Sequence, residues 1–195
     1  GRRTCDVGAS GIHLVRIPKS NHMLREWMAR HYSAPKGFVG RSLIYLVVGN
    51  YRTYGAIVAG SATRFLPGRE AFFGASLPLN NIVNNTFFHI EKVDGRYPYR
   101  NFVPKVLREW RLRVGAAWCE EYGDEVLGWE SLVELPRTGD AYDRDGWTNV
   151  GTTHGYTCKR TAGKGTDSWS GRRAWNTDPT QLRPKHVFVR QATEN

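Results

Sequence analysis

The residues best suited to chemistry lie between positions 129 and 157, where carboxylates, aromatic residues and glycines crowd together. Glu130 and Glu134 belong to an apolar segment, 126–135, that is typical of a β-strand. Side chains at even spacing along a strand share one face, so we expect both carboxylates to point the same way. For either residue alone, exposure on the solvated face of a half-buried strand is the simpler interpretation.

A short connection follows this strand and is crowded with charged and aromatic side chains: Arg137, Asp140, Tyr142, Asp143, Arg144, Asp145 and Trp147. Loops held by a rigid sheet are where binding and catalytic residues are often placed. After Trp147, the segment 150–153 contains a glycine, which lets the backbone approach a neighbouring group closely. We interpret the whole stretch as the centre of a site.

Several elements must position this stretch. Residues 13–17 alternate like a strand, and a helix is predicted from Ser20 or Asn21 to about Arg30, with Met23, Leu24, Trp27 and Met28 on its buried face. Residues 42–48 and 54–61 predict an antiparallel pair, and 84–91 a further strand. Small residues in 54–61 indicate close approach, either by a ligand or by another strand.

The clearest helix begins at Asn101 and ends at Gly123, with its apolar positions spaced at three, four and seven. The loop before it carries Arg96 and Arg100. Free N–H groups and the positive end of the helix dipole would face this loop. Arg96, Arg100 and Asn101 are therefore candidate ligands for a phosphate or another anion.

Basic residues exceed acidic ones, 28 against 18, giving a formal net charge of +10. A polyanionic partner is the natural inference, although a merely soluble basic protein remains the alternative. Nucleic acid is favoured over membrane, because the basic residues alternate with Trp, Tyr and Gly. The segment 159–185 is expected to be mobile alone and to fold onto DNA through Lys159, Arg160, Lys164, Trp169, Arg172, Arg173 and Trp175.

Length and composition favour one domain covering residues 1–195. Cys5, Cys119 and Cys158 are widely spaced and form no Cys-x-x-Cys pair, which indicates reduced thiols in the cytoplasm. The histidines show no metal-ligand spacing, so a bound metal is not expected, and His89 and His154 are interpreted as structural. No apolar run has the length of a membrane span. Residues 184–190 predict an edge strand near the C-terminus.

The order of these pieces resembles the Mom DNA-modification proteins of phage Mu type, which are distant relatives of the GNAT acyltransferases. It also resembles a related uncharacterised domain of transposon and phage-defence proteins. The matching pieces span roughly positions 23–190 and are His31-Tyr32-Ser33, the 54–60 strand, Asn101, Glu130 with Glu134, Gly139-x-x-Tyr142, Trp147-x-x-Val-Gly151-x-Thr, and Pro-Lys-His-Val-Phe-Val at 184–189.

This resemblance implies an α/β (α+β) fold with a GNAT-like mixed, mostly antiparallel sheet flanked by helices. It also implies transfer of a small acyl-derived group, carbamoylmethyl-like, to the exocyclic amine of adenine in double-stranded DNA, inside a bacterial host cell. The donor is expected to be acetyl-CoA or another acyl donor, with its pyrophosphate at the helix that begins at Asn101. The loop before Asn101 lacks the glycine-rich run of ordinary GNAT enzymes.

Within that reaction, a poorly nucleophilic adenine amine needs a nearby base, and the developing oxyanion needs a hydrogen-bond donor. Glu134 suits the first role and Tyr142 the second. His31 could relay a proton, and Ser33 could donate a hydrogen bond or carry the group transiently. For His31 a satisfied core histidine, and for Tyr142 core packing, are the structural alternatives.

Two other functions remain open: a catalytically silent DNA-binding module of a defence or mobile-element system, and a GNAT-type N-acetyltransferase acting on a small amine. The net charge argues against the small amine. Convergence of Glu130, Glu134, Tyr142 and His31 on one pocket would separate the enzyme from the silent module.

Overall fold

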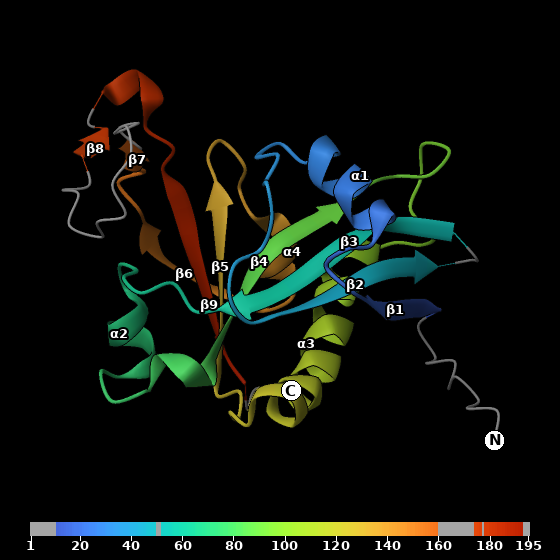
Figure 1. The fold of residues 1–195 in the computed structure, drawn as a ribbon, viewed down its shortest axis with the longest axis horizontal. Coiled ribbons are helices and arrows are strands. Elements are labelled where there is room, and N and C mark those ends of the chain that lie inside the picture. Colours follow the sequence, from blue (N-terminus) through green and yellow to red (C-terminus); the bar gives the residue numbers. More distant parts are fainter. Residues whose placement is uncertain (1–10, 50–51, 160–173, 177, 193–195) are drawn as a thin grey trace, which may run out of the picture.

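The computed structural model describes residues 11–49, 52–159, 174–176 and 178–192, and of the short strands at 157–159 and 174–176 it describes only the main chain. A seven-stranded sheet organises the chain, in the order β1-β2-β3-β4-β5-β9-β6 (Figure 1). Among the described strands, only β4 and β5 pair in parallel. The strands are β1 (Ile12–Ile17), β2 (Ser42–Gly49), β3 (Arg52–Ser61), β4 (Ile82–Ile90), β5 (Gly128–Glu134), β6 (Thr148–Thr152) and β9 (Lys185–Gln191).

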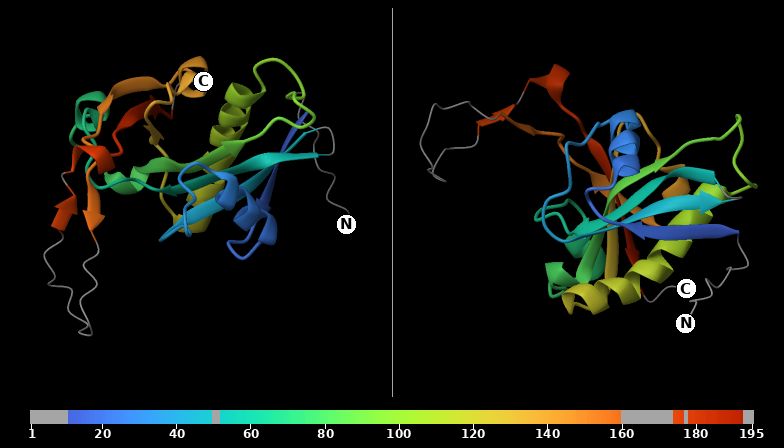
Figure 2. Two further views of the ribbon diagram at one scale, coloured as in Figure 1. Left: turned by 90° about the horizontal axis from the view of Figure 1, so that it is seen from above. Right: turned by 45° about the vertical axis from the view of Figure 1, so that its right-hand side comes forward.

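Helices cover both faces of this sheet, α1 on one side and α3 with α4 on the other (Figure 2). The expected α/β class, with a mixed and mostly antiparallel sheet flanked by helices, is therefore confirmed. The helices are α1 (His22–Arg30), α2 (Arg69–Phe73), α3 (Phe102–Tyr122) and α4 (Asp140–Arg144), with 3-10 turns at Leu79–Asn81 and Pro179–Gln181.

Each helix begins and packs for local reasons. Asn21 caps α1, since its side chain accepts the Met23 N–H at 2.9 Å. Leu24, Trp27 and Met28 then pack against the α1 face of the sheet. On the opposite face, α3 buries an apolar stripe of Phe102, Val106, Leu107, Trp110, Val114 and Trp118. Gly123 ends α3 in the left-handed conformation, as predicted.

Two of the sequence predictions for this region are wrong. The strand predicted at 184–190 as an edge strand lies inside the sheet, because β9 pairs with β5 on one side and β6 on the other. The connection after β5 contains a helix, α4, which was predicted only as a loop. Gly139 starts α4 with φ +81°, and a Cβ there would lie 2.4 Å from the Phe188 ring, so only glycine fits.

The small residues of β3 allow β4 to pack closely against it. A Cβ on Gly55 would lie 1.8 Å from the His89 carbonyl oxygen of β4. Of the two explanations for the small residues, the structure therefore shows close packing of a strand. Beyond β6, strands β7 (Thr157–Lys159) and β8 (Ala174–Asn176) form a separate antiparallel ribbon, which extends away from the main sheet in Figures 1 and 2.

Candidate active site

A cavity opens where β4 and β5 part. Their parallel register runs from Ile82 and Gly128 to Asn85 and Ser131 and ends there, although both strands continue. An irregularity in the β3–β4 pairing, between Val58 and Ala59, lies beside the same point. Beyond Asn85 and Ser131, β4 and β5 no longer pair with each other, although β4 still pairs with β3 and β5 with β9. The resulting cavity has a volume of about 240 Å³.

Tyr142, from α4, closes one side of this cavity. Its hydroxyl donates to Asn85 Oδ1 at 2.6 Å and accepts from Ser131 Oγ at 2.9 Å. Phe188 stacks on the tyrosine ring, with centroids 5.2 Å apart. Burial raises the pKa of Tyr142 far above its ordinary value, so the phenol keeps its proton at neutral pH. The group can therefore donate a proton or a hydrogen bond, but it is not a base.

His31 lines the same cavity from the end of α1. Its Nδ1 lies 2.8 Å from Ser33 Oγ and accepts the Ser33 N–H at 3.3 Å, so the proton of the neutral ring belongs on Nε2. Desolvation lowers the pKa of His31 to about 4, helped by electrostatic interactions with His89 and Arg137. At neutral pH His31 is an uncharged, weakly basic ring fixed in orientation.

Tyr32 and Arg137 complete the mouth of this cavity. The guanidinium of Arg137 lies over the Tyr32 ring, 3.6 Å from its centroid. Ser33 is exposed and is not among the residues that line the cavity. Its hydroxyl orients His31, an arrangement that differs from the expected direct role for Ser33.

Glu134 lies elsewhere. It lines a second, larger cleft of about 670 Å³ together with Arg183 and Lys185. Leu132 borders both hollows, so the cleft and the cavity meet at that residue of β5. The expectation that Glu134, Tyr142 and His31 share one pocket is therefore wrong. Tyr142 and His31 line the cavity and Glu134 lines the adjoining cleft. Alternation along β5 points Ser131 toward Tyr142 and Glu134 toward the other face, which separates Glu134 from Tyr142.

Glu130 is completely buried, although an exposed position was the simpler expectation. Its carboxylate accepts from the Thr63 N–H at 2.6 Å, Asn84 Nδ2 at 2.9 Å and an Arg69 guanidinium nitrogen at 3.0 Å. Burial raises the pKa of Glu130, and the Thr63 and Arg69 hydrogen bonds oppose that shift. Every oxygen has a partner, so Glu130 holds the segment after β3 in place.

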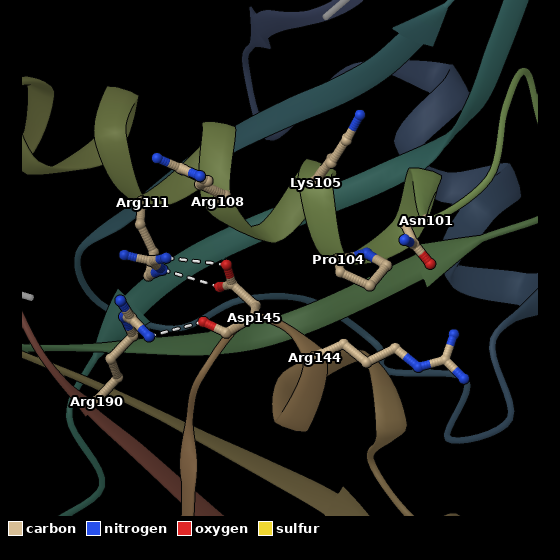
Figure 3. Close-up of a pocket in the computed structure, with 8 residues that line it drawn as sticks. All are labelled: Asn101, Pro104, Lys105, Arg108, Arg111, Arg144, Asp145 and Arg190. Carbon is tan, nitrogen blue, oxygen red and sulfur yellow. Dashed lines mark hydrogen bonds and ion pairs between the residues drawn. The ribbon is translucent and has the colours of Figure 1, made fainter. Parts of the chain in front are cut away.

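A basic pocket of about 430 Å³ lies beside the first turns of α3 and the end of α4 (Figure 3). Asp145 is its one acidic residue and accepts two bonds from Arg111, at 2.9 and 3.0 Å. Arg190 donates to the Asp145 carbonyl at 2.7 Å. The lining residues are Asn101, Pro104, Lys105, Arg108, Arg111, Arg144, Asp145 and Arg190.

This pocket revises the predicted anion site. Asn101 begins α3 and lines the pocket, in a left-handed conformation without a side-chain cap. Arg96 and Arg100 are exposed and do not line it. The basic lining instead comes from α3, α4 and β9. Lys105, Arg108 and Arg111 recur every third position along α3, a spacing that the sequence contained, and Arg111 borders the apolar stripe and is buried.

Asn85 and Ser131 had no comparable signal, because only the strand register brings them to Tyr142. The side chains proposed for DNA, from Lys159 to Trp175, lie outside the described side chains and stay a prediction. Among the described residues, no group of three or more His, Cys, Asp and Glu could hold a metal ion. None of the described helices is long and apolar enough to cross a membrane.

No protein-family model and no curated protein matches this chain. A GNAT family acetyltransferase from Elizabethkingia anophelis with acetyl-CoA bound is 7% identical, with a TM-score of 0.53 over 93% of this chain and 98% of that one. The aminoglycoside 6'-N-acetyltransferase of Enterococcus faecium is 8% identical, with a TM-score of 0.53 over 94% and 98%. A GNAT acetyltransferase of Streptococcus pneumoniae is 10% identical, with a TM-score of 0.51 over 92% and 98%. These likenesses show that the chain has the fold of the GNAT acetyltransferases.

Proposed function

We propose that this protein is an acyltransferase that moves a small acyl-derived group from an acyl thioester to the exocyclic amine of adenine in DNA. One observation carries the proposal. Tyr142 is held by Asn85 and Ser131 at the point where β4 and β5 part, beside a cavity. A protonated phenol beside an open cavity, at the point where two strands part, suits a transfer to an amine.

The residues present fit a phosphate-bearing donor such as acetyl-CoA. Helix α4 borders both the cavity, through Asp140, Ala141 and Tyr142, and the basic pocket, through Arg144. A donor lying along α4 could place its phosphates among the basic side chains and its acyl end beside Tyr142. The five basic residues of the pocket against the single Asp145 favour several negative charges. The likeness to a GNAT structure that holds acetyl-CoA supports the same donor.

The thioester would supply an activated carbonyl carbon. In the transfer, the amine nitrogen forms a bond to that carbon and the carbon–sulfur bond breaks. Burial raises the pKa of Tyr142, so the phenol keeps its proton, and in the transfer its hydroxyl would turn from Asn85 Oδ1 to donate a hydrogen bond to the leaving sulfur. The amine must also lose a proton. Glu134, which lines the cleft on the other side of Leu132, would accept that proton. His31 lines the cavity, and its low pKa makes it a poor base for this proton.

DNA as the acceptor rests on charge and on the resemblance to Mom proteins. The formal net charge of +10 favours a polyanion. A small amine is the second candidate, and the carboxylate of Glu134 in a cleft that adjoins the cavity favours it, since a carboxylate attracts a protonated amine. In either case the group transferred and the chemistry at Tyr142 are the same.

The experiment is to incubate the full chain with acetyl-CoA and double-stranded DNA, digest the DNA, and analyse its nucleosides by mass spectrometry. A new deoxyadenosine derivative, absent without enzyme or donor, is the expected result. Spermidine and an aminoglycoside serve as parallel acceptors. Acylation of these amines with unmodified DNA would replace the DNA proposal by the small-amine function, and no product with any acceptor would favour the silent module.

DNA binding itself has a separate test. If the basic residues of 159–190 contact phosphates, log affinity should fall linearly with log salt, by roughly 0.9 per contact. Arg172→Ala combined with Arg173→Ala should weaken binding and make that slope shallower. A flat salt dependence, or unchanged binding by the double variant, would contradict the assignment of DNA binding to this segment.

A further inference from the structure

The cleft that contains Glu134 carries exposed aromatic rings. Phe65 is 79% exposed and Tyr156 is 50% exposed, and both line this cleft. His154 stacks on Tyr156 with centroids 5.4 Å apart and an interplanar angle of 27°. Large aromatic side chains left in water at a concave surface are typical of binding sites. A volume of about 670 Å³ is within the range of small-ligand sites.

The segment that presents Phe65 is firmly held. Glu130 accepts the Thr63 N–H at 2.6 Å, and Arg69 donates to the Arg64 carbonyl at 2.9 Å. Glu130 and Arg69 also pair with each other, almost completely buried. An almost completely buried ion pair thus fixes the main chain of the two residues before Phe65, and Arg69 itself begins α2 after it. The loop that carries Phe65 is therefore not loose, although the side chain is exposed. A held but exposed aromatic ring is suited to contact a ligand.

The segment that carries His154 and Tyr156 is held by a main-chain hydrogen bond. The Arg183 N–H donates to the Gly155 carbonyl at 2.9 Å, between His154 and Tyr156. Gly155 has φ +75°, and a Cβ there would lie 2.2 Å from the Pro184 nitrogen, so the turn requires glycine. Both segments are therefore held before any ligand arrives, which reduces the entropy lost on binding.

The cleft has charged side chains of both signs. The Glu134 side chain is 19% exposed, and its Oε1 lies 4.0 Å from the Nε of Arg183, whose side chain is 62% exposed. Lys185 is a further lining residue. A carboxylate inside an aromatic cleft accepts N–H groups, and exposed cations at its edge suit phosphates.

From this arrangement we infer that the cleft binds a single unstacked nucleobase that carries an exocyclic amine. The base stacks on Phe65 or on the Tyr156–His154 pair, Glu134 accepts from the amine, and Arg183 with Lys185 contact the flanking phosphates. Stacking of a base on aromatic side chains is tolerant of sequence, and the carboxylate selects bases with an amine over thymine. The inference deepens the proposed function, since the cleft meets the Tyr142 cavity at Leu132, but it concerns binding alone.

The test is fluorescence anisotropy of the full chain with labelled single-stranded oligonucleotides of equal length: oligo-dA, oligo-dT and an abasic strand. No acyl donor is present, so the result does not depend on whether transfer occurs. Phe65→Ala should weaken binding of oligo-dA about tenfold and leave the abasic strand unaffected. Leu112→Ala is the control, because Leu112 is 56% exposed on α3, away from the cleft.

Glu134→Gln should remove the preference of the protein for oligo-dA over oligo-dT, measured as the ratio of the two affinities, because loss of the charge beside Arg183 affects phosphate binding of both strands alike. Equal binding of the base-bearing and abasic strands by wild type would overturn the inference, as would Phe65→Ala acting like Leu112→Ala. Competition by a peptide amine but not by deoxyadenosine would also overturn it and would assign the cleft to a protein terminus. If base binding holds while no nucleoside product forms, only the proposed transfer fails.

Discussion

The hydroxyl of Tyr142 donates to the side-chain oxygen of Asn85 across 2.6 Å, which ties α4 to β4 where β4 leaves β5. Tyr142→Phe removes the hydroxyl. Asn85 Oδ1 then lacks this donor, and Ser131 Oγ lacks this acceptor. We expect at least about a 10²-fold loss of transfer rate if the phenol acts in the transition state. The free energy of unfolding should also fall, by roughly 1–3 kcal/mol, because the hydroxyl is buried and bonded.

Ser131→Ala is the matched control for that variant. It removes the donor at 2.9 Å from the Tyr142 hydroxyl but keeps the phenol. The two variants should lose similar stability in urea unfolding, whereas only Tyr142→Phe should lose most of its activity. Equal residual rates for both would show that the network is structural and that the phenol takes no part in transfer.

The buried pair of Glu130 and Arg69 gives a stability prediction. Glu130→Gln keeps an acceptor for the Thr63 N–H but leaves the Arg69 charge without its counter-ion. Breaking a buried pair typically costs about 3–5 kcal/mol, which should appear as a large fall in melting temperature. Glu121→Gln is the control, because the Glu121–Arg16 pair is nearly half exposed, and such pairs contribute about 0–1 kcal/mol. Similar melting temperatures for both variants would contradict this account.

The low pKa of His31 makes stability depend on pH. In the unfolded chain histidine titrates near 6.5, whereas in the folded protein the pKa is about 4. Between these values the unfolded state binds more protons, so stability falls as pH falls from about 6.5 to about 4. The loss from this residue should not exceed about 3 kcal/mol.

The measurement is urea unfolding between pH 7 and pH 4.5. His31→Gln should show a shallower fall in stability than wild type, so that the difference between the two narrows as the pH is lowered. His22→Gln, at the exposed start of α1, should follow wild type. Parallel curves for wild type and His31→Gln would mean that His31 does not carry this pH dependence.

The sequence predicts those parts of the fold that depend on neighbouring residues better than those that depend on residues far apart in the chain. A cap for α1 at Ser20 or Asn21 and the end of α3 at Gly123 follow from neighbouring residues, and the structure has the cap at Asn21 and the end at Gly123. Helix α4 is only five residues long and was missed, because so short an element shows no apolar period. Glu130 appeared suited to solvent because its partner Arg69 is distant in sequence and nothing local pairs them.

The same limit applied to the site. Tyr142 was predicted as a site residue from its type, its place after a strand and the Gly139-x-x-Tyr142 resemblance, and the structure places it at the cavity. Asn85 and Ser131 depend on the register of two strands far apart in the chain. Glu134 was grouped with Tyr142 because they are near in sequence. The face of β5 separates them, and only the three-dimensional arrangement of β5 and α4 reveals which residues border which hollow.

The proposed acyl donor is expected to bind its phosphates in the basic pocket. Arg108→Glu should weaken binding of coenzyme A at least tenfold, because it reverses a charge at the pocket lined by Lys105 and Arg144. Arg25→Glu is the control, since Arg25 is exposed on α1, on the other face of the sheet. Isothermal titration calorimetry gives both affinities. Equal affinities for the two variants would place the phosphates elsewhere.

The most direct test of acyl transfer at Tyr142 is the release of free thiol from acetyl-CoA, followed with a thiol reagent while an acceptor is present. Wild type should release thiol in the presence of DNA or an amine, well above its rate without acceptor, and Tyr142→Phe should fall at least about 10²-fold below wild type. Thiol release that is independent of any acceptor, or equal in wild type and Tyr142→Phe, would contradict the account.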